Sequence, residues 1–362
     1  MTKRFTKNDS LAVKGTAVLI LLWHHCFLEG RYPGTGMSFF PFTESQVVNI
    51  AYFFKICVSI FAFISGFGLY QSLRKTAEVP GTSRSVTKWY LQRYVKSFSG
   101  FWLIVVLVWI LEQAIDGRTA AAYFQEGRLR GICYMLFQIL GLSNLFGTPT
   151  IQWEWWYMTA ALVFIILAPV FYYGLDKIGS IGCMAVMLLF PRCFGQYPGG
   201  MHFLSFVPAF LLGMIFAKEE LFSKLERRIN GSGKRLCAGI LLFVVLTFAC
   251  YKITMALPRQ KFWDLELGLM PGIYITLIYL TVCKIPGLKT AFRWIGKYSA
   301  DIYLIHELFH SVYARNLVYS SGHFFLSILT LLALSLAAAL CIEGLKRLIR
   351  FPRLVDGLLT KI

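Results

Sequence analysis

The sequence predicts an all-α integral membrane protein, a bundle of about ten transmembrane helices. Of its 362 residues, 57% are apolar and 15% are charged, whereas soluble domains contain roughly 45–50% apolar and 25% charged residues. The mean hydropathy is +0.61. The apolar residues form repeated runs of about 18–20, each long enough to cross the hydrocarbon core of a bilayer as a helix. Short basic loops separate these runs, which is typical of a protein that crosses the membrane many times.

Each predicted span is an apolar run bounded by charged or turn-forming residues. In chain order the predicted spans cover residues 11–28, 50–70, 98–115, 153–174, 178–194, 201–217, 236–256, 266–283, 298–316 and 325–345. The first run contains Lys14 and lacks a small-residue cleavage site, so we expect it to be retained and not removed as a signal peptide.

Segment 131–147 is a further candidate span, and it decides the topology. If it crossed the membrane, the basic loop 218–235 would lie on the opposite side from the basic N-terminus. We therefore expect 131–147 to be an interfacial or re-entrant segment in an outer loop, which leaves most lysines and arginines on one face. By the positive-inside rule that face is cytoplasmic, and both termini lie on it.

The composition also excludes some classes of protein. The net charge of +18 comes from basic loops and not from a basic surface interleaved with stacking residues, so we expect no nucleic-acid partner. The nine cysteines include no CxxC pair, and we predict neither a metal site nor a disulfide framework. Residues 1–362 are predicted to form one transmembrane domain, with 346–362 as a basic cytoplasmic tail against the inner leaflet.

The first predicted helix carries the most informative pair of polar residues. Lys14 and His25 are eleven positions apart, about three helical turns, so they share one face and are separated by roughly 16 Å along the axis. His24 points about 80° away from Lys14. An ionisable side chain within an apolar span indicates a functional site. The alternative is a histidine that only forms a hydrogen bond to a neighbouring helix.

Four stretches, taken together, carry a family resemblance. They are Lys14-Gly15 through His25, Phe61 to Leu69 with Ser65-Gly66-Phe67 inside it, Lys88 to Lys96 with Arg93, and Tyr298 to His306. A fifth, Trp153 to Tyr157, opens an apolar run that continues to Pro169. In order and spacing they resemble the motifs of the membrane-bound acyltransferase 3 family, the integral-membrane O-acyltransferases of bacterial glycans.

The chain departs from the family pattern in two places. An acidic residue often lies three positions before the basic residue of the first motif, where this sequence has Leu11; whether Asp9 substitutes for it stays open. Longer members carry a C-terminal SGNH-type hydrolase domain; we expect none here, so the glycan acceptor cannot be inferred from a second domain.

The resemblance implies transfer of an acyl group, commonly acetyl from acetyl-CoA, to a hydroxyl of an envelope carbohydrate. We therefore expect acyl-CoA as a donor substrate and no permanently bound cofactor. The other partners would be a carbohydrate or glycolipid acceptor and the lipid bilayer, in a bacterial cytoplasmic membrane. A polysaccharide or lipid-linked sugar transporter is the alternative function, because apolar spans, aromatic residues and a cationic cavity suit a transporter too.

His25 is the predicted general base, because a sugar hydroxyl needs a base and histidine has an ordinary pKa near 6.5; a transient acyl carrier is the alternative role. Lys14, together with Arg93 and Lys96, is predicted to bind the phosphates of the donor at the cytoplasmic side. A pantetheine arm is roughly as long as the rise from Lys14 to His25, so we expect the thioester to thread up to His25.

Three more residues complete the predicted site. His306 is expected to orient substrate or support the CoA end, with a helix–helix hydrogen bond as the alternative. Trp156 belongs either to an interfacial aromatic belt or to a platform that stacks on sugars, and Glu154 is expected to contact acceptor hydroxyls. His310 lies one turn beyond His306 and is not included in the site.

Overall fold

The computed structural model describes residues 5–28, 30–33, 36–77, 83–193, 202–229, 231–257 and 263–362. Every regular element within these ranges is a helix. One isolated bridge pairs Ser38 with His323 and fastens the segment after the first helix to the start of a later one. The predicted all-α class is confirmed.

Seven segments in the described ranges are long and apolar enough to cross a membrane, so the chain is a multi-pass membrane protein. They are Lys7–Phe27, Glu44–Ala77, Val86–Ile115, Trp153–Lys177, Gly233–Ala256, Leu265–Lys284 and Phe324–Leu348. The helices that build them are α1 (Lys7–Phe27), α2 (Glu44–Phe53), α3 (Ile56–Ala77), α4 (Ser83–Ile115), η1 (Trp153–Trp155), α8 (Trp156–Cys193), α11 (Gly233–Ala256), α12 (Trp263–Leu280), η3 (Val282–Lys284) and α16 (Phe324–Leu348).

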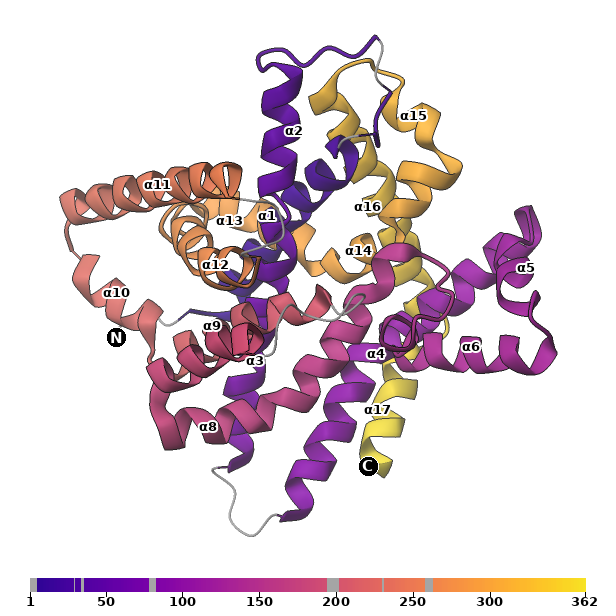
Figure 1. Cartoon of the computed structure of the whole chain (residues 1–362), viewed down its shortest axis with the longest axis horizontal. Helices are drawn as coiled ribbons and strands as arrows, with labels where there is room; N and C mark the ends of the chain where they lie inside the picture. The colour runs from indigo at the N-terminus through magenta and orange to yellow at the C-terminus, as the bar shows by residue number, and fades with distance from the viewer. Residues whose placement is uncertain are drawn as a thin grey trace.

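The remaining helices are shorter. They are α5 (Arg118–Phe124), α6 (Arg128–Leu140), α7 (Ser143–Phe146), η2 (His202–Phe206), α9 (Val207–Lys218), α10 (Leu221–Ile229), α13 (Pro286–Lys297), α14 (Ser299–Glu307), η4 (Leu308–Tyr313), α15 (Arg315–Tyr319) and α17 (Phe351–Lys361). Figure 1 shows α11 at one end of the long axis and α5 and α6 at the other, with α1 between them.

Three of the predicted spans are not long helices. The one at 178–194 is the end of α8 beyond a kink at Gly179, whose φ is 73°, and its apolar part is the short helix Gly179–Leu189. The one at 201–217 corresponds to the short apolar helix Phe203–Lys218. The one at 298–316 is divided among α14, the π-helix η4 and α15, because the backbone changes its hydrogen-bond register there. The count of ten and the cytoplasmic position of both termini stay predictions.

Segment 131–147 is not a spanning helix. It contains most of α6 and all of α7, which are separated where Gly141 takes a left-handed conformation with φ of 76°. The 13 residues of α6 extend about 20 Å, short of the ~30 Å hydrocarbon core. This agrees with a segment that lies along the membrane or re-enters it.

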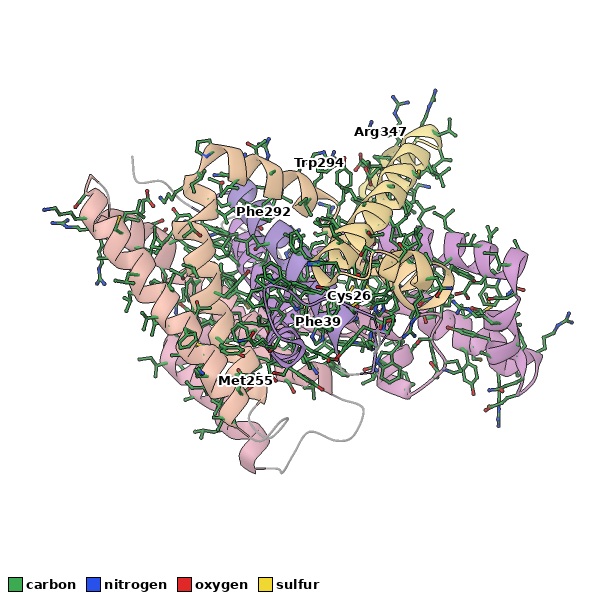
Figure 2. All side chains as sticks on the ribbon, turned by 90° about the horizontal axis from the view of Figure 1, so that it is seen from above. Cys26, Phe39, Met255, Phe292, Trp294 and Arg347 are labelled. Carbon is green, nitrogen blue, oxygen red and sulfur yellow. The ribbon has the colours of Figure 1, made fainter. Side chains whose placement is uncertain are left out.

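Close glycine contacts fix the position of α1. A Cβ added to Gly15 would lie 2.0 Å from the backbone oxygen of Phe292, and one added to Gly296 would lie 1.9 Å from that of Leu11. The two helices therefore touch backbone to backbone, as small residues allow in membrane bundles. Figure 2 labels Phe292 where α13 lies beside α1. The close packing of α1 on α13 therefore explains why the first motif has a glycine at position 15.

Close glycine contacts of the same kind join α3 to α9. A Cβ on Gly66 would lie 1.9 Å from the oxygen of Phe210, and one on Gly213 would lie 2.0 Å from that of Phe63. Most residues of α9 are buried, so this crossing lies in the core. The α3 stretch matched by the Ser65-Gly66 motif is thus a packing surface.

The periphery differs from this core. Only 6% of the spanning window of α11 is buried, and its exposed residues include Leu241, Val245 and Phe248, which indicates a face in contact with lipid. The helix α17 has no buried residue and lies beside α4 (Figure 1). Its basic, amphipathic pattern agrees with the predicted tail against the membrane surface.

Candidate active site

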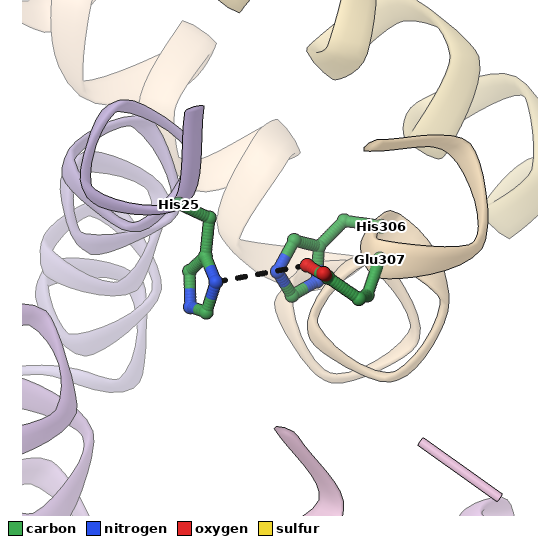
Figure 3. A group of neighbouring side chains, drawn as sticks. All are labelled: His25, His306 and Glu307. Carbon is green, nitrogen blue, oxygen red and sulfur yellow. Dashed lines mark ion pairs between the residues drawn. The ribbon is translucent and has the colours of Figure 1, made fainter. Parts of the chain in front are cut away.

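The candidate site surrounds the side chain of His25, in the last turn of α1. That side chain is 12% exposed. Its ring meets the ring of His306 from α14 at a centroid distance of 4.8 Å and an angle of 75°. Figure 3 shows His25 pointing from α1 toward His306 and Glu307. The structure therefore brings together two histidines that are far apart in the sequence.

Two buried carboxylates face the same nitrogen of His25. Its Nδ1 lies 3.9 Å from Oε1 of Glu154 and 3.7 Å from Oε2 of Glu307. Glu154 comes from η1, at the start of the helical segment that continues as α8, and Glu307 ends α14. A positive charge formed on the His25 ring would be stabilised by both carboxylates, since charge interactions are strong where water is largely excluded.

The guanidinium of Arg31 lies among these three groups. Its Nη1 is 3.1 Å from Nδ1 of His25, 3.6 Å from Oε1 of Glu154 and 3.7 Å from Oε1 of Glu307. Arginine only donates hydrogen bonds, so Nδ1 of His25 accepts and the neutral ring carries its proton on Nε2. The nitrogen that can take up a proton is therefore the one that Arg31 covers.

His306 has the opposite arrangement. It is fully buried, and its Nδ1 lies 2.8 Å from the backbone oxygen of Tyr303. Because a carbonyl only accepts, Nδ1 carries the proton and Nε2 of the neutral ring has a free lone pair. That Nε2 has no hydrogen-bond partner among the described residues. His306 thus offers an acceptor to a ligand.

A second chain of hydrogen bonds approaches Glu307 from the other side. The hydroxyl of Tyr319 lies 2.9 Å from the backbone oxygen of Cys26 and 2.8 Å from Nε2 of His310. The hydroxyl donates to the carbonyl and therefore accepts from His310. Nδ1 of His310 then lies 3.4 Å from Oε2 of Glu307, so this histidine, which the sequence analysis left out, belongs to the site.

The two elements that carry the site residues are joined directly. The indole nitrogen of Trp155 donates to the backbone oxygen of Leu304 at 2.8 Å, and the hydroxyl of Tyr303 donates to the backbone oxygen of Glu154. Both bonds connect η1 to α14, so Glu154 and His306 are held in one rigid group.

The site is rich in acceptors and poor in donors. Oε2 of Glu154, Nε2 of His306, Oε2 of Glu307 and Nδ1 of His310 are buried without a hydrogen-bond partner in the described ranges. Such atoms are costly unless a ligand or water supplies donors. A molecule with several hydroxyl groups is the kind of ligand that satisfies them.

The site also has the spacing of a candidate metal site. One ligand atom each from His25, His306 and Glu307 lie within 4.8 Å of one another. However, Arg31 already supplies a cation to His25 and both carboxylates, and a metal ion there would be repelled by the guanidinium. The arrangement suits hydrogen bonding and proton transfer better than metal binding.

A family model described as an acyltransferase domain matches residues 11–344, nearly the whole chain. The chain belongs to the acyltransferase 3 family. It is therefore a membrane acyltransferase, and the resemblance inferred from the motifs is confirmed. No curated protein and no solved structure is significantly similar to it.

The structure gathers only some of the residues predicted for this acyltransferase. His25, Glu154 and His306 lie together, whereas Trp156 stacks on Phe206 at a centroid distance of 5.5 Å. Glu154 and Trp156 are two positions apart in the sequence, yet the carboxylate lies beside His25 and the indole packs against η2. The aromatic-belt and sugar-platform interpretations of Trp156 both remain open.

The predicted donor-binding residues lie on two helices. Lys14 is half-buried in α1 and has no hydrogen bond or ion pair within the described ranges. Arg93 of α4 donates to the hydroxyl of Ser72 in α3, and Lys96 is exposed. Arg93 therefore joins two helices, while the ammonium groups of Lys14 and Lys96 have no partner among the described residues.

Three residues that surround His25 were not among the predicted site residues. Glu307 and His310 follow His306 at one and four positions, so their spacing on the same helical segment was a usable signal. Arg31 lies in the segment after α1, and no periodic pattern predicts where a loop side chain will point.

Proposed function

We propose that this acyltransferase moves an acyl group, namely acetyl, from cytosolic acyl-CoA to a hydroxyl of an extracytoplasmic cell-envelope or exported glycan. The observation that carries the proposal is the environment of His25: a buried imidazole whose Nδ1 faces two carboxylates and the guanidinium of Arg31. This environment suits a base that becomes positively charged during the reaction.

The proposed reaction takes place at Nδ1 of His25. An acceptor hydroxyl replaces Arg31 on this nitrogen, gives its proton to it, and its oxygen attacks the thioester carbonyl carbon. The imidazolium that forms lies 3.7 Å from Glu307 and 3.9 Å from Glu154, which lower its energy. When the carbon–sulfur bond breaks, the thiolate takes that proton, and the products are the glycan ester and free CoA.

Glu154 and His306 are proposed to position the acceptor. Oε2 of Glu154 and Nε2 of His306 are buried acceptors without a partner in the described ranges, so each can receive a hydrogen bond from a sugar hydroxyl. An acceptor that supplies both bonds gains affinity, and an analogue that lacks one hydroxyl leaves a buried acceptor unpaired.

The donor is proposed to enter from the end of α1 where Lys14 lies. Lys14 and His25 are on one helix, about 16 Å apart along its axis, which is comparable to the length of a pantetheine arm. Lys14, Lys96 and Arg93 would bind the CoA phosphates while the thioester reaches His25. The acyl group would then cross the membrane without a separate carrier.

The test uses purified protein in liposomes with acetyl-CoA radiolabelled in the acetyl group. CoA release and label transfer to extracted envelope glycan are measured for the wild type, for His25→Ala and for the control His323→Ala, which changes a histidine at the start of α16. We expect His25→Ala to lower transfer by roughly 10²–10⁴-fold and His323→Ala to leave it unchanged. Equal transfer by the wild type and His25→Ala would overturn the role of His25.

The same assay distinguishes acyl transfer from transport of a sugar. If the wild type binds no acetyl-CoA and releases no CoA, the acyl-CoA reaction is wrong, and uptake of lipid-linked sugar by the liposomes becomes the next measurement. A transporter needs no base, so His25→Ala should then retain activity.

A further inference from the structure

The position of Arg31 carries an inference that rests on the proposed function and extends it. In the structure Arg31 donates to Nδ1 of His25 at 3.1 Å, so the base nitrogen is covered before substrate binds. A base left uncovered next to an activated thioester would also deprotonate water, and the acyl group would be lost as acetate.

We propose that Arg31 is a positioning residue that covers the base nitrogen of His25 until an acceptor hydroxyl displaces it. The covered state protects the donor, because water must compete with a charged hydrogen-bond donor for the same lone pair. When an acceptor binds, the guanidinium leaves Nδ1 and stays bound to the two carboxylates, so the ion pairs are not lost.

The surroundings of Arg31 suit this movement. Its Nη1 lies 3.6 Å from Glu154 and 3.7 Å from Glu307, beyond ordinary hydrogen-bond length, so a small shift can shorten both contacts while it opens Nδ1. The side chain is 32% exposed, and therefore the shift needs no repacking of the core. The backbone is held separately, since Arg315 donates to the backbone oxygen of Arg31 at 3.0 Å.

The loss reaction has a simple balance. A water molecule gives a proton to Nδ1 of His25, its oxygen bonds to the thioester carbonyl carbon, and the carbon–sulfur bond breaks. The thiolate takes up the proton, so the products are acetic acid and CoA. This reaction needs no glycan and is measured as CoA release in the absence of acceptor.

The first test compares Arg31→Met, which keeps the length of the side chain and removes its donors, with Arg31→Lys, which keeps one donor group. In liposomes with acetyl-CoA we expect Arg31→Met to raise the ratio of acceptor-independent CoA release to glycan transfer by roughly tenfold or more, the size expected when one charged hydrogen bond is lost. Arg31→Lys should restore part of the wild-type ratio. A purely structural role would lower both rates together and leave the ratio unchanged, which would overturn the proposal.

The second test does not depend on the substrate. Diethyl pyrocarbonate acylates unprotonated imidazole nitrogens, and mass spectrometry gives the rate at each histidine, with His323 as an internal reference. We expect Arg31→Met to raise the rate at His25 relative to His323. The control Arg130→Met, which removes a guanidinium that pairs with Glu126 and not with His25, should leave it near the wild-type value. An unchanged rate at His25 in Arg31→Met, or an equal rise in Arg130→Met, would overturn the proposal.

The two tests distinguish a failure of the proposed function from a failure of the role proposed for Arg31. If wild-type protein releases no CoA from acetyl-CoA, the proposed function is wrong. The diethyl pyrocarbonate rates still decide whether Arg31 covers Nδ1 of His25.

Discussion

Oε2 of Glu307 lies 3.4 Å from Nδ1 of His310, one turn later in the chain. The same oxygen lies 3.7 Å from Nδ1 of His25. Glu307 therefore faces two imidazoles at once, and His310 is itself fixed through Tyr319 to the backbone of α1 at Cys26. The carboxylate that would stabilise a charged His25 thus lies between two histidines.

The first prediction concerns that carboxylate. Glu307→Gln keeps the shape of the side chain and removes its negative charge, so the imidazolium of His25 loses a nearby counter-charge. We expect kcat for acyl transfer to fall by roughly 10²-fold, the range found when one electrostatic contact to a transition state is removed, with little change in the KM for acyl-CoA. Steady-state kinetics in liposomes measure both.

The matched control is Glu343→Gln in α16, which removes a carboxylate that pairs with Lys346 and not with His25. Its kcat should stay within about twofold of the wild type, because it contributes no charge near the reacting atoms. If Glu307→Gln and Glu343→Gln have the same kcat, Glu307 does not stabilise the charged base.

The second prediction concerns Lys14. Its ammonium has no ion pair or hydrogen bond within the described ranges, so it is available to a phosphate of the donor. We expect Lys14→Ala to raise the KM for acyl-CoA by roughly 10-fold or more, because a hydrogen bond to a charged group contributes about 1.5–3 kcal/mol. Lys14→Arg should keep most of the affinity. Titration of the donor at saturating acceptor provides the measurement.

Lys289 provides the contrast at the same end of α1. Its ammonium pairs with Asp9 at 2.5 Å, so Lys289→Ala removes the cation that pairs with a buried carboxylate and should lower thermal stability more than donor affinity. A Lys14→Ala variant that melts earlier but binds acyl-CoA normally would assign Lys14 a structural role.

The third prediction tests the glycine crossing of α3 and α9. A methyl group on Gly66 would lie 1.9 Å from the backbone oxygen of Phe210, whereas one on Gly68 of the same helix meets nothing within 4 Å. We expect Gly66→Ala to destabilise the protein by about 1–3 kcal/mol through overpacking. Gly68→Ala should be neutral or stabilising by up to ~1 kcal/mol. Thermal unfolding in detergent, followed by size-exclusion chromatography, compares the two; equal melting temperatures would contradict the close contact.

The fourth prediction concerns Tyr303, whose hydroxyl donates to the backbone oxygen of Glu154. Tyr303→Phe removes this bond between η1 and α14 while Trp155 keeps the other. We expect the KM for the glycan acceptor to rise several-fold and the KM for acyl-CoA to stay constant, because the proposed acceptor contacts depend on the placement of Glu154 and His306. A rise in the KM for acyl-CoA alone would contradict this assignment.

Much of the fold could be predicted from the sequence, because runs of apolar residues define membrane helices almost by length alone. The long spans follow this rule, as α1 and α16 show. The rule fails at 298–316, where composition stays apolar but the backbone forms a π-helix, and hydropathy does not report hydrogen-bond register. Whether the shorter helices reach across the membrane depends on tilt and packing, which composition does not contain.

The candidate site was only partly predictable for a related reason. His25 and His306 were found because each lies in a recognisable motif, and their meeting at 4.8 Å supports treating the motifs as one site. Arg31 was not found, since its side-chain direction depends on how the segment after α1 folds back over the helix end. Glu154 was expected near the acceptor; its approach to His25 depends on how η1 packs on α14.

The bonds that join η1 to α14 have a consequence for the range of acceptors. Trp155 and Tyr303 prevent Glu154 and His306 from moving apart, so the spacing of these two side chains is fixed. Arg31 reaches His25 from outside these two elements, and Arg315 holds its backbone. Differences in acceptor size between related enzymes should therefore reside at residues 30–33, and grafting these residues between them should transfer selectivity while the helices remain unchanged.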